Sequence, residues 1–536
     1  MWILIGGGKP QWTVFRHNGP MFPPEYEPHK VPVKFKGDDV ILPPLAEEYA
    51  TMYAKYIGTE YIERNKFNKN FFNDFKIVLP DKMNNSKIED FDFSKIKEYL
   101  SKDAEKRSNM TKEEKQDIKK ANDILEEPYK YCIIDGAKQK IGNYKIEPPG
   151  IFLGRGDHPK LGMIKKRIES SDIILNLDKD APIPKINNGK EWGSIINDNT
   201  VIWLATWKDN INGKNKYVFT SMDSIFKSKS DESKFDLARK LKKKVNKIRD
   251  SYETQLDSDD NKTRQLATSL YFIDHLALRV GGKKDKKEEA DTVGVTSLRV
   301  EHILLSSPNI VKLDFLAKDS VRFCKKVNVP KPIFDNLIMF TNNKNRKDQL
   351  FDLISASSMN QYLESYMEGL TAKTWRTYNA STLFQKELDK INEDKLKSIH
   401  ENDKINYLLT MFNQANTAVA LLCNHQKTVS SSLDEQIEKF DKQIKEQKKK
   451  KNKYLEKKNK ELASKADSKL RLIKLKKESK LKMKNVSLGT SKTNYIDPRI
   501  IFAFIKRFDV PVDIILTSAL STRFEWANSV DKDYRF

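Results

Sequence analysis

One tyrosine stands in a compact polar segment near the C-terminus, at residues 489–499, which read GTSKTNYIDPR. The segment directly follows a long lysine-rich stretch with a helical pattern. A phenol can attack phosphorus and later leave again, so a tyrosine can hold a reversible covalent link to a nucleic-acid backbone. Tyr495 is therefore the candidate nucleophile.

Two basic side chains lie near the ends of predicted elements. Apolar residues recur on one face over residues 266–280, and Gly281-Gly282 would end this helix, which leaves Arg279 at its exposed last turn. Alternating apolar residues over 311–324 predict a hairpin with Lys318 at its tip. Taken singly, such an arginine is more often a dipole partner, and such a lysine more often serves solubility.

Two further polar residues lie at helix ends. Arg376 follows Gly369 near a predicted helix start, which is a natural anion site. His425 projects from the C-terminal end of a helix predicted over 405–422. A helix C-terminus favours a charged imidazolium, which could donate hydrogen bonds to a phosphate oxygen, although a capping histidine without a ligand is commoner.

The composition indicates a polyanionic partner. The 98 Lys and Arg residues exceed the 75 Asp and Glu residues, giving a formal charge of +23. A basic surface is the footprint of phosphate neutralisation, but excess lysine also occurs in solvated helices and ribosomal-type proteins. With 536 residues and 38% hydrophobic residues the chain can bury several cores. Its length suggests about three or four domains.

Several kinds of chemistry are not supported. The three cysteines, Cys132, Cys324 and Cys423, form no CxxC pair, which argues against a disulfide framework and a structural zinc site. No phosphate-binding loop of the GxxxxGK[ST] type and no cluster of metal ligands occur, so we expect no cofactor, no ATP and no metal. No long apolar run is present, so we expect a soluble intracellular protein without a membrane partner.

The pattern along the chain predicts an α+β protein. Residues 1–225 mix short strand-like runs with prolines, one charged helical stretch near 94–125, and a glycine-rich basic loop at 148–160. From residue 226 the pattern becomes helical. Residues 432–484 contain no glycine or proline and repeat one apolar seam, which favours two antiparallel helices over a solvated single helix or a nuclear-import signal.

Together these segments resemble the eukaryotic type IB DNA topoisomerases. Residues 491–499 are similar to the active-site tyrosine box of that family. The segments that resemble its catalytic core are residues 271–279, 290–294, 297–302, 315–320, 370–381 and 418–426. The resemblance runs from Trp12 to Phe536 in the order of the family.

The resemblance implies four parts that form a DNA clamp. Residues 1–225 would be a mixed α/β cap that binds DNA and comprises core subdomains I and II. Residues 226–428 would be a mostly helical catalytic subdomain, and residues 429–485 an antiparallel coiled-coil linker. Residues 486–536 would form a small helical C-terminal domain that carries the tyrosine.

The resemblance also implies an activity, namely ATP- and metal-independent relaxation of positive and negative supercoils. Tyr495 would cleave one strand to give a 3′-phosphotyrosyl intermediate, and controlled rotation and religation would follow. Arg279, Arg376 and His425 would stabilise the pentavalent phosphorane. Lys318 would be the general acid that protonates the leaving 5′-oxygen.

The family further suggests DNA contacts, a partner and a drug response. The partner would be supercoiled double-stranded DNA, bound by a monomer. Camptothecin-type sensitivity is expected from Phe152, Gly154, Arg155, Asp319 and Asn494. The residues expected to contact DNA are Arg155, Lys216, Asp319, Thr490 and Asn494.

Two departures from the family bear on location and behaviour. Family members usually carry a long charged N-terminal tail with import signals, whereas this chain begins almost at the folded core. A nuclear location is expected, but the import signal is weak or missing, so a viral or cytoplasmic setting stays open. Leu153 stands where arginine is common, and the linker is short, which predicts altered processivity and salt optimum.

Two rival functions share part of this pattern. A tyrosine recombinase has the same arginine, lysine and tyrosine constellation, but it usually shows His-x-x-Arg where this chain has Lys373-x-x-Arg376, and it has no counterpart of the linker. A noncatalytic DNA clamp would keep the fold and the charge. Its expected mark is the loss of Tyr495 or a helper residue, and this chain retains them all.

Overall fold

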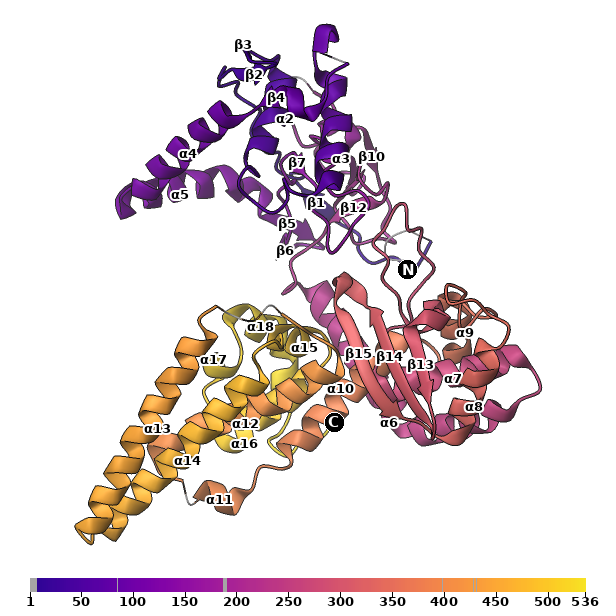
Figure 1. The fold of residues 1–536 in the computed structure, drawn as a ribbon, viewed down its shortest axis with the longest axis vertical. Coiled ribbons are helices and arrows are strands. Elements are labelled where there is room, and N and C mark those ends of the chain that lie inside the picture. The colour runs from indigo at the N-terminus through magenta and orange to yellow at the C-terminus, as the bar shows by residue number, and fades with distance from the viewer. Residues whose placement is uncertain (1–6, 84, 187–189, 398, 428, 430) are drawn as a thin grey trace. The chain divides into compact units, whose positions relative to one another are not determined.

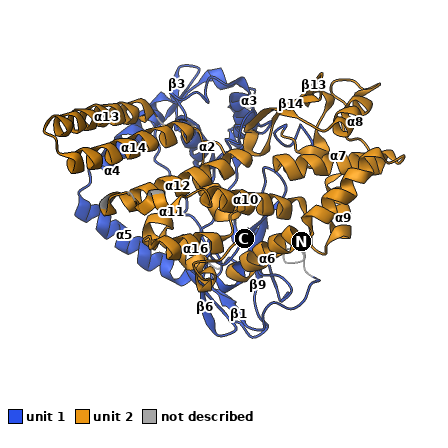
Figure 2. Cartoon of the chain, turned by 90° about the horizontal axis from the view of Figure 1, so that it is seen from below, with its two compact units in different colours: residues 1–227, 284–291 blue, residues 228–283, 292–536 orange. Residues whose placement is uncertain are grey.

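The computed structural model describes residues 7–83, 85–186, 190–397, 399–427, 429 and 431–536. The chain divides into two compact units (Figure 2). Unit 1 comprises residues 1–227 and 284–291, and unit 2 comprises residues 228–283 and 292–536. Both units combine small sheets with helices, which confirms the predicted α+β class. None of the helices in the described part of the chain is both long and apolar enough to cross a bilayer.

Unit 1 contains two hydrophobic cores. One core packs around two sheets and includes Trp12, Phe15, Leu175 and Leu204. The first of these sheets has the order β1-β5-β6, formed by β1 (Phe15–His17), β5 (Tyr131–Ile134) and β6 (Ala137–Lys140). The second has the order β10-β9-β11-β12, formed by β9 (Ile174–Asn176), β10 (Ser194–Ile196), β11 (Ala205–Lys208) and β12 (Asn215–Val218).

The second core of unit 1 is aromatic. Phe67, Phe71 and Phe75 recur every four residues on α3, so they lie on one face and are fully buried. They pack against α2 and a small sheet. The elements around this core are β2 (Val33–Phe35), β3 (Asp38–Val40), α2 (Pro44–Ala54), α3 (Asn65–Phe75), β4 (Phe91–Asp92), β7 (Gly150–Ile151) and β8 (Ile164–Lys165).

The charged stretch near 94–125 is helical as predicted, and it consists of two helices, α4 (Ser94–Asn109) and α5 (Lys112–Glu126). The stretch divides because Thr111 starts a new helix. Its hydroxyl accepts a hydrogen bond from the Glu114 amide, and the Glu114 carboxylate accepts one from the Thr111 amide. This capping box satisfies two backbone amides that, in one continuous helix, would donate to carbonyls of the preceding turn.

Unit 2 is mostly helical and has one large core. Phe272, Trp375, Phe384, Phe412 and Ile501 contribute to it, so the core joins segments that lie far apart in sequence. A three-stranded antiparallel sheet, ordered β13-β14-β15, lies beside the helices (Figure 1). The elements before residue 423 are α6 (Ile225–Thr254), α7 (Asn261–Leu276), β13 (Ile303–Ser306), β14 (Ile310–Leu316), β15 (Arg322–Asn328), α8 (Lys331–Thr341), α9 (Ala356–Tyr366), α10 (Ala372–Leu388), α11 (Glu393–Lys397) and α12 (Glu401–Leu422).

Two long helices follow, α13 (Leu433–Glu456) and α14 (Lys460–Lys482). Ion pairs Lys451–Asp467 at 2.7 Å and Lys477–Asp441 at 2.6 Å join them in antiparallel register. Figure 1 shows the pair as a helical hairpin. The predicted antiparallel pair is thereby confirmed. Only α14 has buried side chains, because it also packs against α12.

The C-terminal segment consists of short helices packed into unit 2: α15 (Leu488–Asn494), α16 (Pro498–Phe508), α17 (Val512–Ile515) and α18 (Ser518–Arg523). Two arginines anchor this segment to α6. Arg499 pairs with Asp236 at 2.7 Å, and Arg523 pairs with Asp231 at 2.7 Å. The second pair is buried on both sides, so it fixes the segment against the long helix.

Candidate active site

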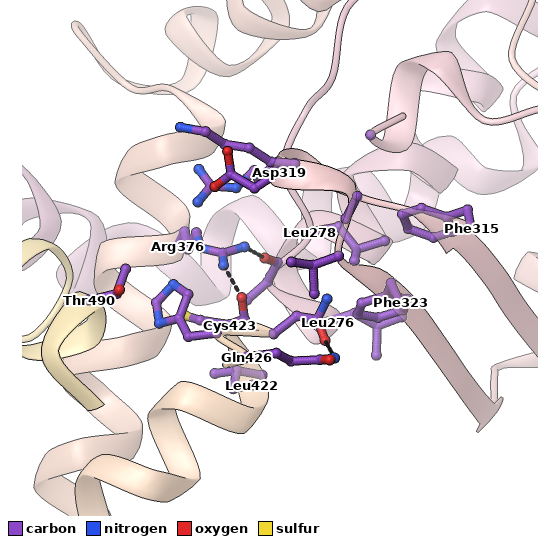
Figure 3. Close-up of a pocket in the computed structure, with 18 of the residues that line it drawn as sticks. Leu276, Leu278, Phe315, Asp319, Phe323, Arg376, Leu422, Cys423, Gln426 and Thr490 are labelled. Atoms are coloured by element: carbon purple, nitrogen blue, oxygen red, sulfur yellow. Dashed lines mark hydrogen bonds between the residues drawn. The ribbon is translucent and has the colours of Figure 1, made fainter. Parts of the chain in front are cut away.

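Arg376 lies in the second turn of α10, whose start is capped by the Thr371 hydroxyl. The guanidinium is buried, with 5% of the residue exposed. Its Nη1 donates to the Ala277 carbonyl at 2.5 Å, and its Nη2 donates to the Cys423 carbonyl (Figure 3). Two carbonyls at the ends of α7 and α12 therefore orient this side chain, rather than the start of its own helix.

Arg279 is not in a helix, which corrects the prediction of a helix through residue 280. Helix α7 ends at Leu276 because Ala277 adopts a left-handed conformation with φ 49°. Arg279 is half-buried in the loop that follows. Gly281, at φ 77°, brings this loop against Gly294 so closely that a Cβ on Gly281 would lie 2.5 Å from the Gly294 Cα.

Asp274 connects the segments that carry Arg279 and Arg376, and it is not among the site residues predicted from the sequence. Its buried carboxylate accepts hydrogen bonds from Arg249 on α6, from Tyr252 on α6 and from Trp375, the residue before Arg376. Burial alone would raise the pKa of Asp274, but the hydrogen bonds from Arg249 and Trp375 bring that pKa below its ordinary value. The only signal in the sequence is an acidic residue inside an apolar helical stretch.

Lys318 follows β14, at the tip of the β14–β15 hairpin. The strands pair from Ile310↔Asn328 to Leu316↔Arg322, which confirms the predicted hairpin. Asp319 and Ser320 both adopt positive φ, 68° and 59°, and so turn the chain sharply. Lys318 is exposed at this turn, where its ammonium can reach a ligand.

His425 follows α12 through a left-handed residue, Asn424, and its amide donates to the Ala420 carbonyl at 2.8 Å. The ring is buried. Burial, together with the nearby charges of Arg376 and Arg279, lowers the pKa of His425 to about 3. The expectation of a charged imidazolium was therefore wrong, because burial and two guanidinium groups outweigh the field of the helix end.

Tyr495 lies at the end of α15 and is 4% exposed. Its amide donates to the Ser491 carbonyl at 2.9 Å, and its carbonyl accepts from the Ser381 hydroxyl at 3.1 Å. The His425 ring packs at a centroid distance of 5.5 Å with an interplanar angle of 27°. The guanidinium carbons of Arg376 and Arg279 lie 5.1 and 6.0 Å from the ring centroid.

The four helper residues line one pocket of unit 2. Arg279, Lys318, Arg376 and His425 all belong to its lining and come from four separate segments of the chain. Two predicted DNA contacts, Asp319 and Thr490, line the same pocket, as Figure 3 shows. A third, Asn494, donates to the Thr490 carbonyl at 3.1 Å.

The pocket lining carries more positive than negative side chains, and two of its buried nitrogen atoms have no hydrogen-bond partner in the described part of the chain. Among the described residues, no carboxylate forms an ion pair with Arg279 or Arg376. The Nε of Arg376 and the Nε2 of His425 are buried and lack hydrogen-bond partners in the described part of the chain. Buried polar nitrogens without hydrogen-bond partners, and buried cations without a nearby anion, cost free energy. The pocket is therefore suited to an anion that supplies several oxygens. Within the described ranges, no three His, Cys, Asp or Glu residues cluster as metal ligands.

The other two predicted DNA contacts belong to unit 1. Arg155 is exposed in the loop between β7 and β8, flanked by Gly154 and Gly156, which both have φ 63°. Lys216 lies on β12 with its ammonium 3.5 Å from the Asp209 carboxylate.

The chain matches three family models of eukaryotic DNA topoisomerase I. The DNA-binding fragment matches residues 10–220, the catalytic core matches residues 223–458, and the C-terminal topoisomerase domain matches residues 467–536. Together these matches extend over most of the sequence.

Individual relatives agree with the family match. The rat protein named DNA topoisomerase I, mitochondrial, is 40% identical over 565 residues, which span 100% of this chain and 94% of the relative. Human DNA topoisomerase 1 is 40% identical over 557 residues, 98% of this chain and 72% of the relative. The Caenorhabditis elegans DNA topoisomerase 1 is 41% identical over 557 residues, 98% of this chain and 68% of the relative.

The chain belongs to the eukaryotic DNA topoisomerase I family. It is a DNA-binding isomerase that relaxes DNA by the type IB mechanism. This family membership does not favour a recombinase or a noncatalytic clamp.

Proposed function

We propose that this chain relaxes both positively and negatively supercoiled double-stranded DNA, without ATP or metal, through Tyr495. The observation that carries this proposal is the convergence on the Tyr495 ring of two guanidinium groups that form no ion pair with a carboxylate among the described residues. Both arginines also line the pocket, where the Nε of Arg376 and the Nε2 of His425 are buried without hydrogen-bond partners in the described ranges. This arrangement matches a tyrosine that attacks a phosphodiester.

In the proposed cleavage step, the Tyr495 phenol oxygen attacks the phosphorus of one DNA strand and releases its proton to water. The new bond is a 3′-phosphotyrosyl ester, and the bond that breaks frees the 5′-oxygen. Religation is the reverse attack by the 5′-hydroxyl. One phosphodiester replaces another in each direction, so no energy source is needed.

Arg279 and Arg376 would bind the nonbridging oxygens as negative charge grows on the phosphorane. Each preorganised donor of this kind is worth about a hundredfold or more in rate. The two carbonyl hydrogen bonds of Arg376 supply that preorganisation, because they fix the guanidinium before DNA arrives. His425 would add one hydrogen bond from a neutral ring, since its pKa lies near 3.

Lys318 would protonate the leaving 5′-oxygen. Its position supports this role, because the hairpin tip carries an exposed ammonium at the rim of the same pocket. General acid catalysis of this type contributes about 10²- to 10⁴-fold. Neither oxygen of the reaction then needs a metal ion.

We further propose that DNA is held by both units as a clamp. Residues 1–225 would act as the cap, 226–428 as the catalytic subdomain, 429–485 as the linker and 486–536 as the C-terminal domain. Arg155 and Lys216 in the cap, with Asp319, Thr490 and Asn494 near the pocket, would contact the duplex. The lysines of α13 and α14 would make transient electrostatic contacts with the downstream DNA and so slow its rotation.

The proposed species is a monomer in the nucleus. A single chain carries all five proposed catalytic residues, so a second copy is not needed for chemistry. One relative is named as mitochondrial, so the mitochondrion is the alternative location. Imaging of the tagged full chain, with light scattering of the purified protein, tests both statements.

The decisive experiment is relaxation of positively and negatively supercoiled plasmids in EDTA without ATP. The wild type should relax both, and Tyr495→Phe should relax neither while still binding DNA. Equal activity of the two proteins would overturn the assignment of Tyr495. Activity that requires magnesium and ATP would overturn the proposed mechanism.

A further inference from the structure

Ser491 contacts two proposed catalytic residues at once. Its hydroxyl oxygen lies 2.7 Å from the Nδ1 of His425, and both residues are buried, Ser491 completely. Its carbonyl accepts hydrogen bonds from the amides of Tyr495 at 2.9 Å and Ile496 at 3.1 Å. One residue of α15 therefore ties the tyrosine segment to the histidine that follows α12.

The direction of this hydrogen bond and the ring nitrogen that carries the proton are linked, because a hydroxyl can either donate to Nδ1 or accept from an Nδ1–H. A neutral imidazole has one N–H and one acceptor nitrogen, and the partner of one nitrogen sets the state of the other. If the Ser491 hydroxyl donates to Nδ1, the proton sits on Nε2. This nitrogen is buried in the pocket lining and has no partner among the described residues. An Nε2–H can donate to a phosphate oxygen, whereas a bare Nε2 would repel it.

We propose that Ser491 is a positioning residue that holds His425 as the Nε2–H tautomer and aims this donor at the scissile phosphate. The proposal rests on the proposed role of His425 in cleavage. Ser491 itself does not touch the reacting atoms. It acts through the ring of His425, as partners of catalytic and metal-bound histidines do elsewhere.

A purely structural role predicts a different result. Ser491 could simply fill a buried space beside Tyr495, in which case its removal would disturb the tyrosine and leave His425 unaffected. Ser381 is the matched comparison, because it is also a buried serine that contacts the Tyr495 segment. Its hydroxyl donates a hydrogen bond to the Tyr495 carbonyl and accepts one from the Asp497 amide.

The test is a double-mutant cycle on single-turnover cleavage of a nicked DNA duplex. Ser491→Ala should lower the cleavage rate about 10- to 100-fold, the usual effect of losing such a partner. DNA affinity, measured in the Tyr495→Phe background, should stay unchanged. Glutamine has no tautomers, so on a His425→Gln background Ser491→Ala should cost no more than about twofold. Ser381→Ala should instead cost the same on both backgrounds.

The inference is overturned if Ser491→Ala cleaves at the wild-type rate, or if it loses the same factor with and without His425. A second readout does not depend on rate. Nitrogen-15 NMR of histidine-labelled protein should show His425 as the Nε2–H form in the wild type and in Ser491→Thr, which keeps the hydroxyl. Ser491→Ala should add the Nδ1–H form, and an unchanged spectrum contradicts the proposal.

A failure of the proposed function would give a different result in these experiments from a failure of the Ser491 inference alone. If His425→Gln cleaves as fast as the wild type, His425 has no role in cleavage and the Ser491 inference falls with it. If His425→Gln is slow but shows no coupling to Ser491→Ala, only the positioning role of Ser491 is wrong.

Discussion

The guanidinium carbon of Arg376 lies 5.1 Å from the centre of the Tyr495 ring. The two residues are far apart in sequence and meet because α10 and α15 both pack against α12. The same guanidinium is held by carbonyls at the ends of α7 and α12. The position of one side chain therefore depends on three helices and the tyrosine segment together.

Two replacements of Arg376 should distinguish the effect of its charge on cleavage from the effect of its hydrogen-bonding geometry. Arg376→Ala should lower single-turnover cleavage at least about a hundredfold. Arg376→Lys keeps the charge but cannot donate in two fixed directions, so it should remain at least about tenfold slow. Arg346→Ala, at an exposed site of unit 2, is the control and should cleave normally. Cleavage by Arg376→Lys at the wild-type rate would show that charge alone suffices.

Lys318→Ala should slow cleavage of ordinary DNA by about 10²- to 10⁴-fold, because the 5′-oxygen then leaves without a proton. A substrate with sulfur in place of the bridging 5′-oxygen should restore the rate, since a thiolate leaves readily unprotonated. Lys326→Ala, on β15 of the same hairpin, should behave as the wild type with both substrates. An equal loss with oxygen and sulfur would argue that Lys318 is not the general acid.

Adjacent glycines in the loop after Arg279 should respond differently to alanine. Gly281 has φ 77°, and a Cβ there would lie 2.5 Å from the Gly294 Cα and amide nitrogen, whereas a Cβ on Gly282 meets nothing within 4 Å. Gly281→Ala should therefore destabilise unit 2 by about 1–3 kcal/mol and slow cleavage by displacing Arg279. Gly282→Ala should change neither. Urea unfolding and single-turnover cleavage measure the two effects, and equal behaviour of the variants would contradict the prediction.

The low pKa of His425 should make unit 2 less stable in mild acid. An unfolded histidine titrates near 6.5, whereas His425 titrates at about 3, so between these values the unfolded chain binds the extra proton. The free energy of unfolding should then fall as pH falls, by about 1–2 kcal/mol between pH 7 and pH 5 from this residue. Urea unfolding should show this loss in the wild type and a smaller loss in His425→Gln.

A variant that leaves His425 in place provides the control for this pH dependence. Arg346→Ala, at an exposed site of unit 2, should lose as much stability between pH 7 and pH 5 as the wild type. Cleavage by the wild type should also show no titration of His425 in that range. A rate that falls with an apparent pKa near 6.5, and only when His425 is present, would mean that the ring is not held neutral.

The local elements were largely readable from the sequence. Alternating apolar residues predicted the hairpin around Lys318, and the repeated seam without glycine or proline predicted α13 and α14. Helix boundaries were less accessible. The capping box at Thr111 divides the predicted helical stretch near 94–125 into two helices, and the left-handed Ala277 ends the predicted helix of 266–280 before Arg279. Both boundaries arise because a single residue can end a helix within an otherwise continuous pattern.

The sequence by itself determined the residue types, the net positive charge and the polar segment around Tyr495. Only the tertiary structure decided their physical state. His425 is neutral because distant segments bury it beside Arg376 and Arg279, and its Nδ1 meets the Ser491 hydroxyl only because α12 and α15 come together. Periodicity reports which face of an element is apolar, whereas desolvation and contacts between charges depend on which elements meet.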